Sequence, residues 1–374
     1  MTTLRHATLP LRRASLAALL TLAACNDEPC GQPGDICRLV GTGELGFNRD
    51  GLAPDQTDLY LVSAARPGPA GDDRLYIMDF NNQRLRRLDD QGRVETVVGS
   101  GFHAIAATEV PLLETPLENP IDFDFLADGR LVFVSYHDPR VLEVGQDGTL
   151  HSLAGAGDGV VGVLGNEGDG GPATDALFIQ LDGIAVTPDD AIYVSDSLAN
   201  RVRFIQDGII TTVAGTGEAA YTGDEGPATQ AALHWPTALE LDPEGNLYIV
   251  DTFNHAIRRL GLDGTLTTVV GTGIEGDSGD GGPATQAQLR QPFGMALGEN
   301  GEIYIGDRGN FRIRKVGADG IIETIAGTGV EGAGKGGPAM KTNIGYVARI
   351  ALDDQGLLIA DQSNSLIWRL HLQD

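Results

Sequence analysis

The 374-residue chain contains very little lysine, since Lys315, Lys335 and Lys341 are its only three. Its 26 basic residues stand against 52 acidic ones, which gives a formal net charge of −26. Proteins that bind nucleic acid do so through clustered basic side chains. The composition therefore argues against nucleic acid as a partner, and strong acidity is typical of an exported domain.

Helical periodicity and the common catalytic motifs are also missing. Beyond the first 24 residues no useful stretch has a helical pattern, so a helical fold is excluded. The chain has no G-x-S-x-G, no H-E-x-x-H and no phosphate loop. His255, four residues after Asp251, resembles one of the zinc-ligand positions of the peptide-amidating lyase, but a catalytic zinc needs about three protein ligands. The other histidines considered fall at unrelated points of the chain's repeat: His103, His137, His151, His234 and His371. We therefore predict no catalytic residue and no protein metal ligand.

The N-terminus has the pattern of an export signal. Arg5, Arg12 and Arg13 precede an apolar run of 11 residues that starts at Ala14 and is too short to span a membrane. The run ends in Leu-Ala-Ala-Cys at 22–25, which resembles the bacterial lipobox. We predict that residues 1–24 are a lipoprotein signal peptide, that Cys25 is lipidated and that residues 25–35 are a tether.

The chain has only two further cysteines, Cys30 and Cys37. Lipidation of Cys25 would leave them as an even pair in an oxidising compartment. Such a pair favours a small disulfide loop over free thiols or a metal site made of two thiolates. A bridge to Cys37 would fix the tether against the folded domain.

A unit of about 55 residues recurs along the rest of the chain, and its clearest copy begins at Leu247 with LYIVDTFNHAIRRLGLDGTLTTVVGTG. Each unit contains four short apolar segments separated by Gly and Asp turns, which is the pattern of a four-stranded β-propeller blade. Copies were aligned on the position after the second strand, occupied in turn by Asp79, Tyr136, Asp196, Asp251, Asp307 and Asp361. The sequence thus predicts an all-β, six-bladed propeller over residues 36–374.

The sixth unit ends near Leu370, before its outer strand. Residues 36–43, ICRLVGTG, match the outer strands of the other units but precede the first complete unit. We predict that this N-terminal strand completes the last blade, closes the ring and leaves no open sheet edge.

The D-x-x-N-x-x-I-R pattern, followed by DG and a TVAGTG strand, resembles the NHL-repeat β-propeller. Asn82, Asn254, Asn310 and Asn364 match the Asn of this pattern. The resemblance covers roughly residues 36–374 and is weakest in the second unit. Together with the lipobox at Cys25, it implies a propeller of the bacterial lipoprotein type. It does not imply one function, because such propellers support ligand binding, partner binding and several chemistries.

Long links between units carry a second repeat, GDGGPAT or a variant of it, in which Asp169, Asp224, Asp280 and Lys335 occupy one position. In a four-stranded antiparallel blade these links leave from the face that also carries the loop between strands two and three. We therefore predict a partner-binding face that includes these four residues. A single carboxylate per loop is a poor calcium site, and the simpler interpretation is that each Asp stabilises its own turn.

The predicted inner strands alternate large apolar residues with small ones, such as Gly183 and Ala185. Four charged residues break this rule: Asp122, Asp124, Glu240 and Arg349. Charges among Gly and Ala near a propeller axis are desolvated unless they are paired or bind a metal. We select these four as a candidate axial site. Their simpler interpretation is mutual pairing or contact with channel water.

Two functions remain in view. The first is a noncatalytic, lipid-anchored, monomeric propeller in the cell envelope that needs no cofactor and binds a protein, peptide or glycan. The second is a hydrolase or lyase of the lactonase or esterase kind that uses Ca²⁺ or another divalent ion at the axis. Because no catalytic set is visible, the sequence favours the first.

Overall fold

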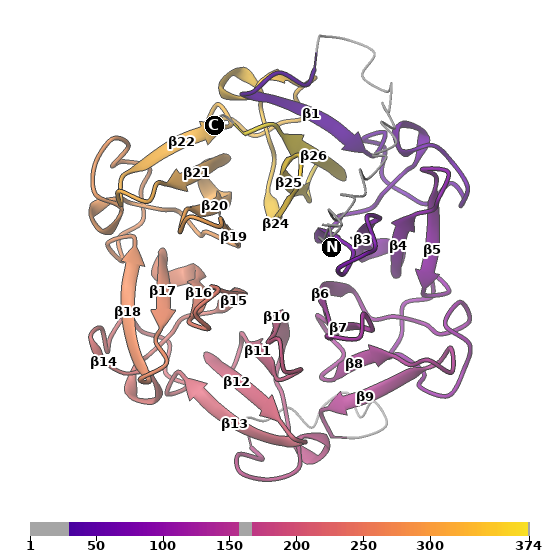
Figure 1. The fold of residues 1–374 in the computed structure, drawn as a ribbon, viewed down its shortest axis with the longest axis horizontal. Coiled ribbons are helices and arrows are strands. Elements are labelled where there is room, and N and C mark those ends of the chain that lie inside the picture. Colours follow the sequence, from indigo (N-terminus) through magenta and orange to yellow (C-terminus); the bar gives the residue numbers. More distant parts are fainter. Residues whose placement is uncertain (1–29, 157–166, 373–374) are drawn as a thin grey trace, which may run out of the picture.

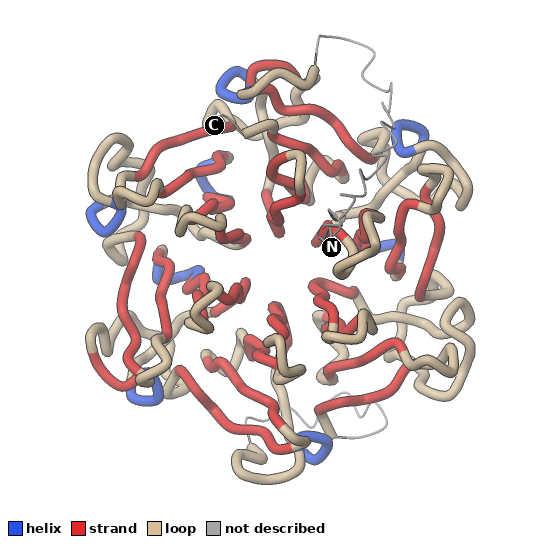
Figure 2. Tube along the Cα trace, in the orientation of Figure 1, coloured by secondary structure: helices blue, strands red, loops and turns tan. Residues whose placement is uncertain are grey.

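A computed structural model describes residues 30–156 and 167–372. These residues form a ring of six antiparallel sheets with no α-helix in the described part and eight short 3-10 turns (Figures 1 and 2). Each sheet has the strand order of a propeller blade. The predicted all-β, six-bladed architecture is confirmed.

In the first five blades the four main strands follow the chain from the axis outward, and in the sixth the three inner strands do so. Blades 1 and 2 contain β2 (Ala64–Pro67), β3 (Leu75–Asp79), β4 (Arg84–Leu88), β5 (Val94–Val98), β6 (Pro120–Phe125), β7 (Leu131–Ser135), β8 (Val141–Val144) and β9 (Leu150–Ala154). Blades 3 and 4 contain β10 (Leu181–Val186), β11 (Ile192–Asp196), β12 (Arg201–Gln206), β13 (Ile209–Ala214), β15 (Pro236–Leu241), β16 (Leu247–Asp251), β17 (Ala256–Leu260) and β18 (Thr265–Val270). Blades 5 and 6 contain β19 (Gly294–Leu297), β20 (Ile303–Asp307), β21 (Arg312–Val316), β22 (Ile322–Ala326), β24 (Val347–Asp353), β25 (Gly356–Asp361) and β26 (Leu366–Leu370).

The N-terminal strand β1 (Asp35–Val40) closes the ring, as predicted. It pairs antiparallel with β26, so that Ile36 lies opposite Leu370 and Arg38 opposite Trp368. Figure 1 shows β1 as the outer strand of the sixth blade, beside the C-terminal strands. Ile36 is fully buried, so the closing strand contributes to the core as well as to the sheet.

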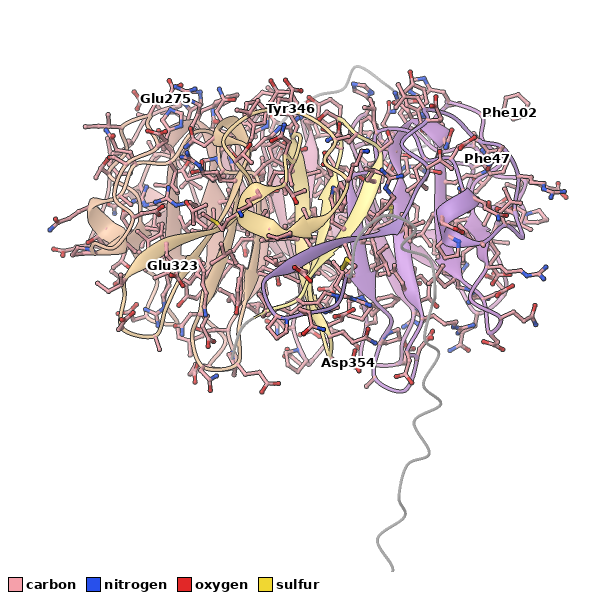
Figure 3. All side chains as sticks on the ribbon, turned by 90° about the horizontal axis from the view of Figure 1, so that it is seen from above. Phe47, Phe102, Glu275, Glu323, Tyr346 and Asp354 are labelled. Atoms are coloured by element: carbon pink, nitrogen blue, oxygen red, sulfur yellow. A yellow bond between two sulfur atoms is a disulfide. The ribbon has the colours of Figure 1, made fainter. Side chains whose placement is uncertain are left out.

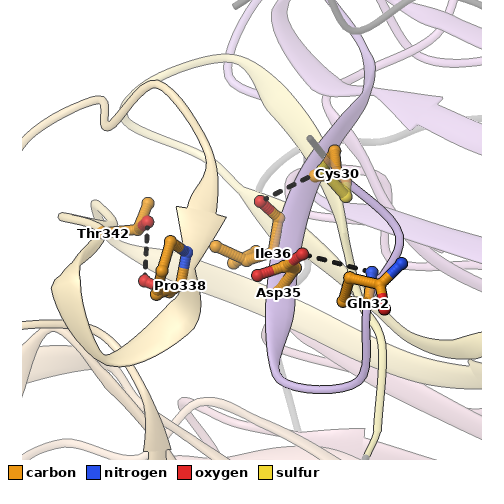
Figure 4. The surroundings of a disulfide bond; sticks show 7 residues. Cys30, Gln32, Asp35, Ile36, Pro338 and Thr342 are labelled. Carbon is orange, nitrogen blue, oxygen red and sulfur yellow. Dashed lines mark hydrogen bonds between the residues drawn. A yellow bond between two sulfur atoms is a disulfide. The ribbon is translucent and has the colours of Figure 1, made fainter. Parts of the chain in front are cut away.

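A disulfide joins Cys30 to Cys37 and holds the residues before β1 against the sixth blade (Figure 4). The Cα atoms of the two cysteines are 5.9 Å apart. On its other edge, β1 pairs with β23 (Gly337–Pro338), which lies opposite Asp35 and Ile36. The predicted disulfide is therefore present.

The ring has two unlike faces. The long-loop face carries the links between blades and the loops between second and third strands, and the turn face carries the tight turns joining the other strand pairs. Figure 3 shows Phe102, Glu275 and Tyr346 at the long-loop face and Asp354 at the turn face. The amide of Gly34 donates to the carbonyl of His371, directly after β26, so the N-terminal segment reaches the ring at the turn face.

Apolar side chains of neighbouring blades pack together to form the core. Val134 of blade 2, for example, belongs to one buried cluster with Ile184 and Ile205 of blade 3. Full burial of such a side chain contributes about 1.5–3 kcal/mol. Packing between blades therefore fixes their relative positions, and with them the side chains that line the axis.

The repeated Asp and Asn form a buried polar network. Asp251 accepts hydrogen bonds from the amide of His234 at 2.7 Å, from Asn254 Nδ2 at 2.8 Å and from Arg258 at 3.3 Å. Asn254 Nδ2 also donates to the carbonyl of Ala220 in the incoming link. The pattern that carries the family resemblance thus ties the incoming link to its blade in blades 1, 4, 5 and 6. The Asp and Asn recur at this spacing because together they satisfy buried polar groups of the link and of the third strand.

One detail of the repeat alignment was wrong. Ser135, and not Tyr136, occupies the repeated Asp position in blade 2, because Ser135 lies opposite Pro120 as Asp251 lies opposite Pro236. A serine cannot replace the carboxylate. Asp138 instead binds Arg140 through both carboxylate oxygens at 2.7 Å.

Candidate functional site

The four predicted axial residues meet at the centre of the ring. Arg349 on β24 donates from Nε to Asp122 Oδ2 on β6 at 3.0 Å, although the two residues are 227 positions apart. Arg349 also donates to the carbonyl of Asp182 and lies 5.0 Å from the centre of the Phe293 ring. Both members of the Arg349–Asp122 pair are almost fully buried. The two side chains neutralise each other's charge, as expected if the charged inner-strand residues pair with one another.

Arg66 on β2 completes this group and was missed in the sequence. Its guanidinium lies 2.9 Å from Glu240 Oε1 and 3.8 Å from Asp122 Oδ1. Arg66 lies opposite Tyr76 as Glu240 lies opposite Tyr248, so the two occupy equivalent positions on their inner strands. Including the first unit in the inner-strand alignment would have revealed it. We call Arg66, Asp122, Asp124, Glu240 and Arg349 the axial cluster.

Burial dominates the electrostatics of the axial cluster. It raises the pKa of Glu240 to about 7, although the nearby charge of Arg66 opposes the shift. Burial likewise raises the pKa of Asp124, whose two oxygens accept the amides of Val186 and Phe125, each at 2.8 Å. The cluster holds three carboxyl groups and two guanidinium groups, so its charges nearly cancel.

The axial cluster borders a cleft of about 470 Å³ on the turn face. Arg66, Asp124 and Glu240 line it together with the small residues Ala296 and Ala351. A hydrolytic metal centre needs carboxylates free to coordinate the ion. Here Arg66 occupies the space between Glu240 and Asp122. The arrangement is suited to holding the blades together or to a polar contact, and it offers no free carboxylate pair.

A second group lies where the channel meets the long-loop face. The Arg308 guanidinium lies 4.5 Å from the centre of the Phe293 ring and 5.1 Å from that of Tyr346, and it donates to Gln362 at 2.9 Å. Asp182 is fully buried, and burial raises its pKa although Ser197 and Arg349 oppose the shift. Asp182 also raises the pKa of half-buried Tyr136, for which burial is the larger cause. We call Tyr136, Asp182, Phe293, Arg308 and Tyr346 the mouth cluster.

The residues predicted for the partner face do not lie together on one face. The links run down the outside of the blades, where β14 (Gly226–Pro227) pairs with the start of β18 near the turn face. Asp169 contacts the buried Arg203 at 2.7 Å. Asp224 and Asp280 contact Arg258 and Arg314 at 3.6 and 2.6 Å, while Lys335 is exposed. These aspartates hold the links to the blade edges through arginines of the third strands.

Two histidines that appeared unrelated in the sequence meet in space. His103 Nε2 lies 2.8 Å, and His137 Nδ1 3.3 Å, from Glu118 Oε1. No sequence motif links the three residues, because His103 and Glu118 lie at opposite ends of the long link between β5 and β6 and His137 lies in the loop after β7. His255, by contrast, accepts the amide of Gln291 through Nδ1 at 3.1 Å and belongs to no such group in the described residues.

Comparison with known proteins places the chain among NHL-repeat propellers. Residues 273–353 match the profile of the teneurin NHL domain. Teneurin-m of Drosophila melanogaster is 30% identical over 301 residues, which cover 74% of this chain and 10% of that protein. The human NHL repeat-containing protein 2 is 25% identical over 312 residues, covering 73% of this chain and 42% of that protein. The chain thus spans well under half of the curated relatives it matches.

Solved structures agree on the fold. An auxiliary nutrient binding protein from Bacteroides thetaiotaomicron superposes with a TM-score of 0.65 at 15% identity, over 90% of this chain and 75% of that one. A gluconolactonase from Xanthomonas campestris gives a TM-score of 0.53 at 15% identity, over 84% and 87% of the two chains. The repeat network, the closed ring and these matches identify the protein as an NHL-repeat β-propeller.

The expected membrane attachment concerns a part of the chain outside the described residues. The signal peptide, Cys25 and the first part of the tether lie there. Within the described residues, no helix has the length and apolar character needed to cross a membrane.

Proposed function

We propose that this propeller is a noncatalytic binding protein of the bacterial cell envelope, anchored through a lipid on Cys25. Its long-loop face would contact a protein, peptide or glycan partner, and the ring would act as a monomer. One observation carries the proposal: the N-terminal end of the described chain meets the ring at the turn face, and most exposed apolar side chains lie on the other face.

The attachment side follows from β1. Its first residues lie beside His371 at the turn face, and the Cys30–Cys37 disulfide holds the preceding segment there. Five residue steps separate Cys25 from Cys30, and an extended chain spans at most about 3.6 Å per residue. A lipid on Cys25 would thus keep the membrane within roughly 18 Å of Cys30. The turn face would then be directed towards the membrane and the long-loop face away from it.

The long-loop face carries the surface expected for recognition. Its loops expose Phe47, Phe102, Leu198, Phe253, Ile274 and Tyr346, with exposed fractions from 37% to 75%. The mouth cluster adds a guanidinium and a buried carboxyl group at the centre of the same face. Exposed aromatic side chains around a few polar groups are typical of binding sites.

The alternative, a metal-dependent hydrolase or lyase at the axis, has less support. Arg66 and Arg349 neutralise the carboxylates that would bind the ion. The related folds include both an auxiliary nutrient binding protein and a gluconolactonase, so fold alone does not decide between binding and catalysis. The charge pairing of the axial cluster favours binding.

Crosslinking in cells tests which face is used. A photoreactive residue at Phe253 or Tyr346 should form specific crosslinks to a partner. The same residue at Leu262, a 77% exposed position in a tight turn of the opposite face, is the matched control. Crosslinks confined to Leu262 would reverse the proposed orientation.

Two further experiments test the anchor and the enzyme alternative. Cys25→Ser should release the protein from the membrane fraction or leave it unprocessed, because stable anchoring needs the lipid chains. A processed variant that remained in the membrane fraction would contradict lipidation. Lactonase or esterase turnover that is lost in Glu240→Gln would instead establish the enzyme alternative.

A further inference from the structure

We propose that His103, Glu118 and His137 form a binding site for a first-row divalent metal ion, of which Zn²⁺ is the best match. The three residues converge on the long-loop face of blade 2, and their potential ligand atoms all lie within 4.8 Å of one another. The proposal does not depend on the lipid anchor or on the identity of any partner.

Two loops supply the ligands, because both ends of one inter-blade link contribute. His103 lies in the link between blades 1 and 2 and bridges to Leu117, while Glu118 lies just before β6. His137 follows β7 in the loop between the second and third strands. Backbone pairing on both sides fixes these segments, since the amide of Tyr136 donates to the carbonyl of Asn119 at 2.9 Å. The ligands are therefore held in place by the blade itself.

The positions of His103 and Glu118 have equivalents in other blades, where the described residues form no metal-ligand group. The bridge between His103 and Leu117 corresponds to that between Glu275 and Leu289, so His103 is equivalent to Glu275. Glu118 is accordingly equivalent to Arg290, and in blade 5 these two positions form an ordinary salt bridge at 2.8 Å. Blade 2 replaces the guanidinium with a carboxylate and the carboxylate with an imidazole.

The corresponding positions of blade 4 also lack a ligand set. Ala219 takes the place of His103, and His234 packs against Phe253, with ring centres 5.2 Å apart, where Glu118 meets His137. Among the described residues, two imidazoles and a carboxylate come together only in blade 2. Blade 5 fills these positions with one salt bridge and blade 4 fills them by packing. Neither role requires two imidazoles and a carboxylate.

The electrostatics also favour a bound cation. Within 4 Å, the salt-bridge partners of Glu118 in the described chain are the two imidazoles. Each imidazole carries a ring nitrogen that can coordinate a metal ion. Arg140, in the same loop as His137, is already bound to Asp138. A metal ion would supply the positive charge that Glu118 otherwise lacks.

The geometry and ligand types fit Zn²⁺. Zinc binds His nitrogen and Glu oxygen at about 2.0–2.2 Å in tetrahedral sites, which places neighbouring ligand atoms roughly 3.3 Å apart. The observed separations from Glu118 Oε1 are 2.8 and 3.3 Å. Two nitrogen ligands argue against Ca²⁺ and Mg²⁺, which prefer oxygen. Asn119 Oδ1, 2.8 Å from His103 Nε2, is a further oxygen close to the site.

An ion held by these three ligands would keep a coordination position open to solvent. The two imidazole side chains are 55% and 54% exposed, whereas Glu118 is 16% exposed. His137 also packs against Tyr136 of the mouth cluster, with ring centres 4.8 Å apart. The open position could therefore take water or a carboxylate from a molecule bound at this face.

Calorimetric titration of the tag-free mature protein with Zn²⁺ at pH 7.5 tests the proposal. We expect one saturable site per chain, and affinity at least tenfold weaker in His103→Ala, His137→Ala and Glu118→Gln. His151→Ala is the matched control, because His151 is also exposed and lies 3.1 Å from Asp147, yet within residues 30–156 and 167–372 it joins no second imidazole in a ligand group. It should bind Zn²⁺ like the wild type.

Cobalt provides an independent measurement. Co²⁺ in a site with nitrogen and oxygen ligands should give visible absorption bands that disappear in His137→Ala and persist in His151→Ala. Circular dichroism of each variant should match the wild type, since the substituted imidazoles are exposed. Absence of a saturable site, unchanged affinity in His103→Ala and His137→Ala, or loss of binding in His151→Ala or Glu240→Gln instead would overturn the proposal.

Discussion

Removal of the closing strand should strongly destabilise the ring. A chain that begins at Gly46 lacks β1, and therefore lacks the buried Ile36 and Val40 and the four-residue register with β26. Two such side chains contribute about 1.5–3 kcal/mol each. Four backbone hydrogen bonds add about 0.5–1.5 kcal/mol each. The expected loss is roughly 5–12 kcal/mol, which is comparable with the whole stability of a typical domain.

Urea unfolding followed by tryptophan fluorescence measures this loss. The chain has two tryptophans, and Trp368 is fully buried opposite Arg38 of β1. In a Trp235→Phe background the signal reports only on this edge. Removing β1 should shift the emission to longer wavelength as well as lower the unfolding midpoint.

Two controls separate the strand from its neighbours. A chain that begins at Gly31 loses the disulfide but keeps β1, and should unfold much closer to the wild type. Ile36→Ala should cost about 2–5 kcal/mol, as large-to-small substitutions in cores do. If the chain starting at Gly46 unfolded at the wild-type midpoint with unchanged Trp368 emission, closure by β1 would not stabilise the ring.

Two further predictions concern the axial cluster. Arg66→Met leaves Glu240 without its ion-pair partner, while Asp122 keeps Arg349, and should cost about 3–5 kcal/mol in urea unfolding. Adding Glu240→Gln should recover part of the loss, and a fully stable single variant would show that the pairing contributes nothing. Burial raises the pKa of Glu240 and of Asp196 to about 7, far above the values near 4 of the unfolded chain. Between about pH 4 and 7 the folded state therefore binds more protons, and its stability should fall as the pH rises. Thermal unfolding from pH 5 to 8 measures this trend. Glu240→Gln should reduce the dependence of the melting temperature on pH. A melting temperature that rises with pH would contradict the raised pKa values of these carboxyl groups.

The sequence could predict the ring because the relevant information is local and repeated. Alternating apolar residues specify each strand, Gly and Asp specify the turns, and the matching strand at residues 36–43 specifies closure. The Cys30–Cys37 bridge was predictable because the two residues are close in sequence. Even so, the alignment placed Tyr136 where Ser135 belongs, because blade 2 lacks the carboxylate on which the repeat was aligned.

Tertiary structure decided the sites. Arg349 and Asp122 come from strands 227 positions apart, and which of the charged inner-strand residues meet depends on how the blades pack around the axis. The GDGGPAT links appeared to lie on one face, yet their path down the blade edges became visible only once β14 paired with β18. His103 and His137 occupy different points of the repeat, but folding of one blade brings both to Glu118. Periodicity fixes each strand within its own blade, whereas contacts between loops and across the axis depend on the closed ring.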